Sequence, residues 1–155
     1  MKAIRPMLMK SGRWAALVAG VLLTNVANGA ISQSDIVRPA GTEAFSADRA
    51  ALVAKGEALW NDKSLSSKGK LACASCHKDN VKQFKTTFLE PYPHAVKMAQ
   101  KRADLDSISA EGMVQFCMLV PMKNDTLPWD SEELAALTAY TEDVVQQDFI
   151  AKKKK

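Results

Sequence analysis

The pentapeptide Cys73-Ala74-Ser75-Cys76-His77 constrains this 155-residue chain more than any other feature. Two cysteines separated by two residues and followed by a histidine form the pattern of covalent haem attachment. The two thiols add across the haem vinyl groups from one tight turn, and the adjacent imidazole can then bind the iron. The alternative is a zinc or thiol-redox site, but zinc needs more Cys or His partners than the chain offers. We therefore predict one covalently attached haem c on Cys73 and Cys76, with His77 as proximal iron ligand.

The beginning of the chain has the composition of a targeting segment. Residues 1–13 carry four basic side chains and no acidic one, an apolar run follows over 14–26, and small residues lie at 27–30. This order is typical of a secretory signal peptide, with an uncleaved membrane anchor as the alternative. Haem is attached to such motifs outside the bacterial inner membrane, so we expect a periplasmic protein.

The net charge of +4 arises at the two ends of the chain. Of the 21 basic residues, four precede Trp14 and four are the terminal Lys152–Lys155, which leaves 13 against 17 acidic residues. The basic ends are therefore no indication of nucleic-acid binding. We expect the Lys-rich tail to be solvated, with docking to a partner or a membrane surface as the alternative.

Helical patterns fill the middle of the chain, and no strand pattern is visible. Ser46 is expected to cap a helix that ends at Trp60, and Ser109 to cap another that ends at Leu119. Asp130 and Glu133 stand at the spacing of a capping box for the last helix. A short helix is also expected over 94–102. The predicted division is a signal peptide over 1–30, a flexible leader over 31–45, an all-α domain over 46–149 and a Lys-rich tail over 150–155.

Two further patterns flank the haem motif. Gly-Glu-Ala-Leu-Trp precedes it at residues 56–60, and Asp-Ser-Glu-Glu-Leu-Ala-Ala-Leu-Thr-Ala-Tyr follows at residues 130–140. Together with the motif, these segments resemble the first and last helices of class I cytochromes c. The resemblance implies an all-α domain wrapped around one covalently attached haem. It also implies that the two helices cross, with Leu59 or Trp60 near Leu137 and Tyr140.

A narrower similarity covers the second half of the chain. Tyr92-Pro93 and residues 109–140 are similar to the haem domain of the A subunit of SoxAX thiosulfate-oxidising cytochromes. That family ligates its catalytic haem iron through a cysteine, and the matching position is Cys117. The family places basic residues four before and one after this cysteine, where the present chain has Met113 and Met118. The loss of these cations disfavours binding of an anionic sulfur substrate.

The sequence offers two main candidates for the distal ligand, which binds the iron on the side opposite His77. We favour Met122, because a Pro-Met pair in the loop before the final helix is the usual way in which class I cytochromes present their distal ligand. Its thioether would raise the reduction potential. Cys117 is the rival, since it is the thiol left over after haem attachment, and a thiolate would lower the potential. His94, expected to be exposed, is a third candidate, and Met98, Met113 and Met118 are also able to ligate.

These observations predict a periplasmic monohaem cytochrome that carries single electrons between redox proteins. No acid–base or nucleophile constellation accompanies the motif, so no catalytic residue is predicted. The alternative is a subunit of a sulfur-compound oxidoreductase with its haem ligated by Cys117. Two further alternatives are a thiol–disulfide protein without haem and a gas sensor with an open iron position.

Overall fold

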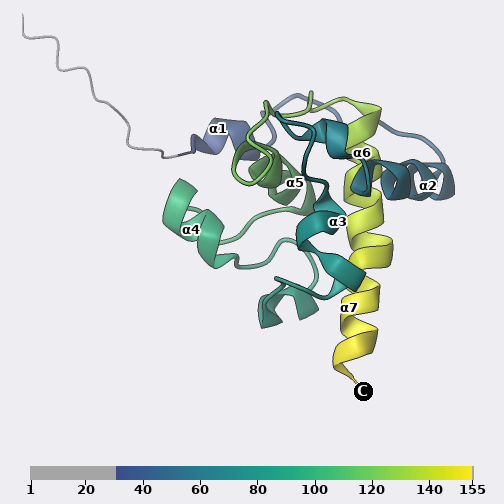
Figure 1. Cartoon of the computed structure of the whole chain (residues 1–155). Helices are drawn as coiled ribbons and strands as arrows, with labels where there is room; N and C mark the ends of the chain where they lie inside the picture. The colour runs from purple at the N-terminus through teal and green to yellow at the C-terminus, as the bar shows by residue number, and fades with distance from the viewer. Residues whose placement is uncertain (1–30, 155) are drawn as a thin grey trace, which may run out of the picture.

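A computed structural model describes residues 31–154, and within this range it is helical, with a single isolated antiparallel bridge between His94 and Ile108 (Figure 1). The all-α prediction is therefore confirmed. The predicted signal peptide lies outside the described residues. The elements in chain order are α1 (Gln33–Ile36), α2 (Arg49–Trp60), η1 (Lys63–Leu65), α3 (Cys73–Cys76), η2 (Lys78–Asn80), η3 (Thr86–Leu89), α4 (Lys97–Ala103), α5 (Ala110–Leu119), α6 (Glu132–Tyr140), η4 (Thr141–Val145) and α7 (Gln146–Lys153).

The crossing of α2 and α6 forms the main packing contact of the domain, as the resemblance to cytochromes c implied. A Cβ atom on Gly56 would lie 2.2 Å from the carbonyl oxygen of Ala136 and 2.6 Å from Cβ of Tyr140. Only glycine lets the two backbones approach so closely. One turn further along α2, the Trp60 ring lies 5.7 Å from the Tyr140 ring, and both belong to one buried cluster with Leu137.

Two of the predicted helix caps are corrected by one or two residues. Asp48 rather than Ser46 caps α2, because its carboxylate accepts the N–H of Ala51 at 2.9 Å. Ser131 rather than Asp130 caps α6, with its hydroxyl accepting from Leu134. Asp48 and Ser131 are both favourable N-cap residue types, and each lies closer than the predicted cap to the first free backbone N–H groups of its helix. The cap that was predicted for α5 at Ser109 is confirmed, since its hydroxyl accepts from Gly112.

The final helix continues beyond α6 through a π-helical segment, η4, into α7. The boundary of the Lys-rich tail predicted over 150–155 is corrected, since residues 150–153 belong to α7, while Lys152 and Lys153 are exposed to solvent as expected. The Lys152 ammonium donates to the carbonyl of Asp79, and the Lys153 ammonium lies 5.6 Å from the centre of the Phe149 ring. In Figure 1 the long α6–α7 rod passes beside α3 and so borders the haem motif.

The flexible leader that was predicted over 31–45 is corrected for its first part. Ile36 in α1 is only 1% exposed and belongs to a second buried cluster that includes Phe116 of α5. Gln33 donates to the carbonyls of Ala103 and Asp104, which ties α1 to the end of α4. The sequence pattern does not reveal this packing because only one large apolar side chain of α1 enters the core. Within residues 31–154, no helix is long and apolar enough to cross a membrane.

Candidate haem site

The haem motif folds as a single helical turn, α3, that ends at its histidine. The Ser75 hydroxyl accepts the N–H of Ala72, and the N–H of His77 bonds to the carbonyl of Cys73 at 3.0 Å. Cys73 and Cys76 are both half-buried and free of disulfide bonds. Burial raises the pKa of the Cys73 thiol to about 11, so this thiol is neutral at pH 7. One turn of helix therefore presents two thiols and the following imidazole together.

The imidazole of His77 is oriented by a backbone carbonyl. Its Nδ1 lies 3.1 Å from the carbonyl oxygen of Lys82, which can only accept a hydrogen bond. Nδ1 therefore carries the proton in the neutral ring, and Nε2 keeps its lone pair. Burial lowers the pKa of His77, which favours this neutral form. A carbonyl on the far nitrogen is the usual partner that fixes a ligating histidine.

Aromatic rings surround the His77 ring. Phe84 stacks on it at a centroid distance of 4.2 Å and an interplanar angle of 12°, and Trp60 lies at 5.8 Å and 29°. Phe84 stacks in turn on the buried Phe88 at 4.0 Å. These contacts join the imidazole to the main core, so the rotation of its ring is restricted.

The loop that carries the Lys82 carbonyl has an unusual backbone. Asp79, Asn80 and Gln83 have φ values of 53°, 53° and 65°, in the left-handed region that L-residues seldom adopt. The long final helix holds this loop in place, since Asn80 donates to the Asp148 carboxylate at 2.9 Å. Strained residues of this kind persist where surrounding contacts over-determine them. Here the contacts fix the carbonyl that orients His77.

Helix α5 brings Cys117 to the side of the haem motif. Val114 packs against the same cluster as Cys73 and Ala74, and Cys117, three residues further along α5, lies on the same helix face. Burial raises the pKa of the Cys117 thiol to about 12, and the Cys73 and Cys76 thiols add to this shift.

Tyr92 lies in the same region. Its pKa is raised mainly by burial, and further by Cys117 and by Glu142. Its ring stacks on His94 at 4.2 Å, and its peptide bond to Pro93 is cis. Tyr92 packs against the same buried cluster as Cys73 and Val114, so the Tyr92-Pro93 segment that carried part of the sequence resemblance borders the haem motif.

Met122 lies in the loop that follows α5 and is 4% exposed. Its N–H donates to the carbonyl of Cys117, and its own carbonyl accepts from Ser67. The loop is anchored further on by Gln115, whose amide donates to and accepts from the backbone of Leu127 at 2.7 and 2.9 Å. The structure thus holds Met122 and Cys117 in one hydrogen-bonded turn.

The other candidate ligands have different surroundings. His94 is 4% exposed, which corrects the expectation that it is exposed, and its Nδ1 lies 3.1 Å from the carbonyl of Glu90. Met98 is 52% exposed on α4, and Met113 packs against the cluster of α1 and α4. Met118 is buried.

Two contributors to the site were missed by the sequence analysis. The Lys82 carbonyl could not be found, because any residue supplies a carbonyl and only the loop path brings this one to His77. Gln115 had a weak signal, since it is a polar residue inside the apolar stretch 113–119. Such a residue is retained inside a core when its hydrogen bonds are satisfied.

The donor set of this region fits a covalently attached haem. Cys73 and Cys76 would hold it through thioether bonds, and the free Nε2 of His77 would bind its iron. The indole N–H of Trp60 is buried without a hydrogen-bond partner among the described residues. An unpaired buried donor is costly, so it suits an acceptor on a bound group. Within residues 31–154, no three His, Cys, Asp or Glu side chains are arranged to hold a free metal ion, which disfavours the zinc alternative.

Comparison with known proteins points to the same cofactor. The sequence matches the family described as SoxA/TsdA, cytochrome c domain, over residues 55–147. No curated protein and no solved structure matches the chain. The matched range covers more than half of the chain and includes the second half of α2, the haem motif, α5 and α6. The chain therefore belongs to the SoxA/TsdA cytochrome c domain family and is a haem-binding electron-transfer domain with covalently bound haem c.

Proposed function

We propose that this chain is a periplasmic monohaem c-type cytochrome that carries single electrons between redox proteins, with His77 as the proximal iron ligand. The hydrogen bond from His77 Nδ1 to the Lys82 carbonyl carries this proposal, because it leaves Nε2 free for iron beside two attachment thiols. The signal-like composition of residues 1–30 supports the periplasmic location. Haem supplies an iron that gains or loses one electron. The rings of Phe84 and Trp60 exclude water from the imidazole.

We assign the distal ligand to Cys117, although the sequence pattern alone favours Met122. Two observations support Cys117. It shares a helix face with Val114, which packs against the same cluster as Cys73. It also matches the cysteine by which the SoxA haem domain ligates iron. Binding of Cys117 as thiolate requires loss of its proton, and coordination to iron would supply the stabilisation that burial removes.

Met122 is the second candidate for the distal ligand. Its backbone bonds to Cys117, so a small change of the loop would exchange one sulfur for the other. However, its loop position is fixed from two sides, by the Ser67 N–H and by the pairing of Gln115 with Leu127. These contacts favour a packing role for its side chain.

The surroundings of α5 favour an electron carrier over a sulfur-compound oxidoreductase. Met113 occupies the position at which the SoxA family has arginine, and it packs into the apolar cluster of Ile36 and Phe116. Met118, the position of the second basic residue, is 2% exposed. Neither position supplies a cation to an anionic sulfur substrate. The alternative in which Cys117 takes part in sulfur chemistry thus lacks the charges that would bind such a substrate.

Spectroscopy of the ferric holoprotein tests both the cofactor and the ligand. A pyridine haemochrome assay is expected to give one covalently bound haem per chain. Electron paramagnetic resonance is expected to give a low-spin thiolate signal that is lost in Cys117→Ala and retained in Met122→Ala. The reduction potential should rise in Cys117→Ala, because the thiolate favours ferric iron.

The exposed Met98 provides the matched control. Met98→Ala removes a thioether of the same size from α4 and should leave the spectrum and the potential unchanged. A methionine-to-iron charge-transfer band in the wild-type protein, lost only in Met122→Ala, would return the distal position to Met122. The absence of covalent haem would refute the cytochrome proposal as a whole.

A further inference from the structure

Two aromatic rings of different chemistry lie next to the His77 ring in the described part of the chain. Phe84 stacks on His77 at a centroid distance of 4.2 Å, and Trp60 lies at 5.8 Å. An indole ring gives up an electron to a strong oxidant, whereas the benzene ring of phenylalanine does not under biological conditions. Oxidising equivalents that leave the iron through His77 can therefore pass to Trp60 but not to Phe84.

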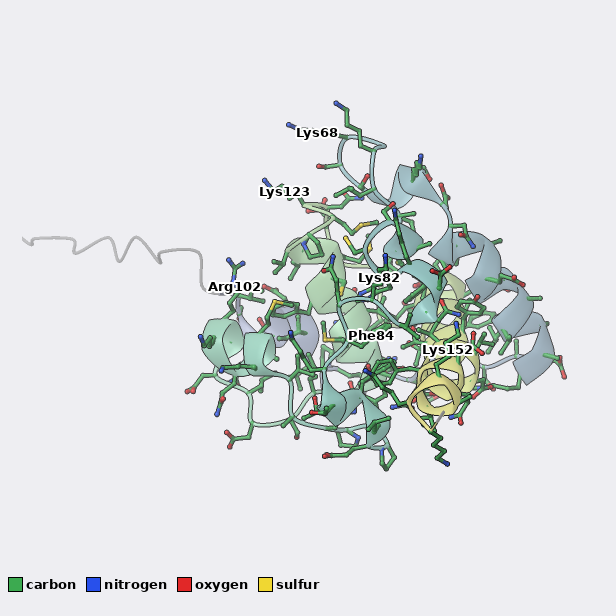
Figure 2. The ribbon with its side chains drawn as sticks, turned by 60° about the horizontal axis from the view of Figure 1, so that its bottom comes forward. Lys68, Lys82, Phe84, Arg102, Lys123 and Lys152 are labelled. Carbon is green, nitrogen blue, oxygen red and sulfur yellow. The ribbon has the colours of Figure 1, made fainter. Side chains whose placement is uncertain are left out.

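The branch through Phe84 leads from one phenylalanine ring to others. Figure 2 shows Phe84 next to the final helix, in yellow, whose Phe149 ring meets Phe84 edge-on at 5.6 Å. Phe84 also stacks on Phe88 at 4.0 Å, and the Tyr92 ring lies beyond Phe88 at 6.1 Å. Two rings that resist oxidation therefore separate His77 from Tyr92 along this branch.

The branch through Trp60 continues directly to a tyrosine. The Tyr140 ring lies 5.7 Å from the Trp60 ring at an interplanar angle of 53°, which is an ordinary contact geometry for two aromatic rings. An electron tunnels readily between rings in contact. The close crossing of α2 and α6 at Gly56 holds the two rings at this separation. His77, Trp60 and Tyr140 thus form an unbroken series of rings.

Trp60 and Tyr140 differ in what can happen to their protons. The indole N–H of Trp60 is buried, and no described residue accepts a hydrogen bond from it. An oxidised indole that keeps its proton is a stronger oxidant than a phenol that can release one, so the electron deficiency moves from Trp60 to Tyr140. Tyr140 retains 7% exposure, and water can accept its proton there. The series of rings therefore has a direction, from His77 outward.

We propose that Trp60 and Tyr140 form a relay that carries oxidising equivalents from the haem to the protein surface when the holoprotein meets hydrogen peroxide. The inference rests on the proposed ligation of haem by His77 and adds a protective activity to electron transfer. Hydrogen peroxide becomes two waters by taking up two electrons, together with two protons from solvent. One electron comes from the haem, and the other comes from Tyr140 through Trp60, while the phenolic proton of Tyr140 passes to water. The product is a tyrosyl radical at the surface.

Detection of the radical tests the relay. Ferric holoprotein is mixed with hydrogen peroxide and frozen for electron paramagnetic resonance, and a spin trap followed by peptide mass spectrometry locates the radical. Tyr140→Phe and Trp60→Phe keep an aromatic ring at each position but remove the readily oxidised group. Tyr92→Phe and Trp129→Phe are the matched controls, since Trp129 packs on the guanidinium of Arg38 instead. Absorption spectra and reduction potentials verify that the haem environment is the same in each variant.

The wild-type protein is expected to give a tyrosyl signal and a spin-trap adduct on Tyr140, both of which are lost in Tyr140→Phe. Trp60→Phe should also lose the adduct on Tyr140, and its haem should bleach faster because the oxidising equivalents stay there. The two control variants should keep the adduct and the wild-type rate of bleaching. Cys117→Ala should raise the yield of the adduct, because it opens the iron position opposite His77 to peroxide.

Three outcomes would overturn the relay and leave the electron-carrier proposal intact. They are an adduct on Tyr140 that persists in Trp60→Phe, an adduct that is lost in either control variant, and the absence of a Tyr140 radical from both the wild-type and the Cys117→Ala holoproteins. The carrier proposal is judged separately, by covalent haem and reversible one-electron reduction. If the chain held no covalent haem, the carrier proposal would fail and the relay would fail with it.

Discussion

Gln115 has a structural role that depends on one side chain. It is fully buried in α5, and its amide satisfies both backbone groups of Leu127. Gln115→Leu keeps the approximate volume of the side chain but leaves the N–H and the carbonyl of the half-buried Leu127 without these partners. We expect the free energy of unfolding of the holoprotein to fall by about 2–5 kcal/mol, because each unpaired buried group costs on the order of 1–3 kcal/mol. Urea denaturation that is followed by circular dichroism measures this change.

Gln147 provides the control for the same substitution. It is exposed on α7, so Gln147→Leu should change the free energy of unfolding by less than about 0.5 kcal/mol. If Gln115→Leu were as stable as Gln147→Leu, the hydrogen bonds to Leu127 would not be what holds the distal loop.

At the scale of helices, the close crossing of α2 and α6 depends on the absence of a side chain at Gly56. Gly56→Ala would favour the isolated helix by about 1 kcal/mol. In the folded protein, however, the added Cβ would meet backbone and Cβ atoms of α6 at 2.2 and 2.6 Å. These atoms cannot rotate away, so the helices must separate. We expect a net loss of about 2 kcal/mol or more, which a thermal unfolding curve measures.

An alanine-to-glycine substitution at a neighbouring site of α2 separates the effect of helix packing on stability from the effect of helix propensity. Ala54 is exposed on the same helix, and Ala54→Gly should destabilise the protein by about 1 kcal/mol through propensity alone. If Gly56→Ala stabilised the protein, the close approach of α2 and α6 at this point would be wrong.

At the scale of the whole molecule, an ion pair between distant segments makes the stability depend on pH. The hydrogen bond from Arg49 lowers the pKa of Asp143 below its ordinary value of 3.8. Its contribution to stability is therefore present above that value and is lost as the pH falls through the lowered pKa. Arg49→Met should reduce stability at pH 7, by less than about 1 kcal/mol because both side chains are exposed. The deficit relative to wild type should disappear toward pH 2.

Urea denaturation at pH 7, 5 and 2 measures this convergence. Lys63→Met removes an exposed cation that has no ion pair among the described residues, and its difference from wild type should stay small and constant with pH. A deficit of Arg49→Met that persisted undiminished at pH 2 would contradict an electrostatic origin.

Elements with a strong local signal were predictable, and those held by distant contacts were not. The Ser109 cap and the approach of Trp60 to Tyr140 follow from local hydrogen bonding and from a known helix pattern. The packing of Ile36 was missed because a four-residue helix has little periodicity of its own. Likewise, the sequence does not predict that the helix continues to Lys153, since a run of lysines has no apolar stripe to mark a helix.

The sequence by itself determined the cofactor, because Cys73, Cys76 and His77 lie within five residues and local geometry is enough to bring two thiols and an imidazole together. It also determined the helical class through its caps and apolar stripes. Only the tertiary structure decided which tautomer His77 adopts and that Val114 of α5 packs against the same cluster as Cys73. These properties depend on contacts between segments far apart in the chain, for which a linear pattern of residues has no local signal.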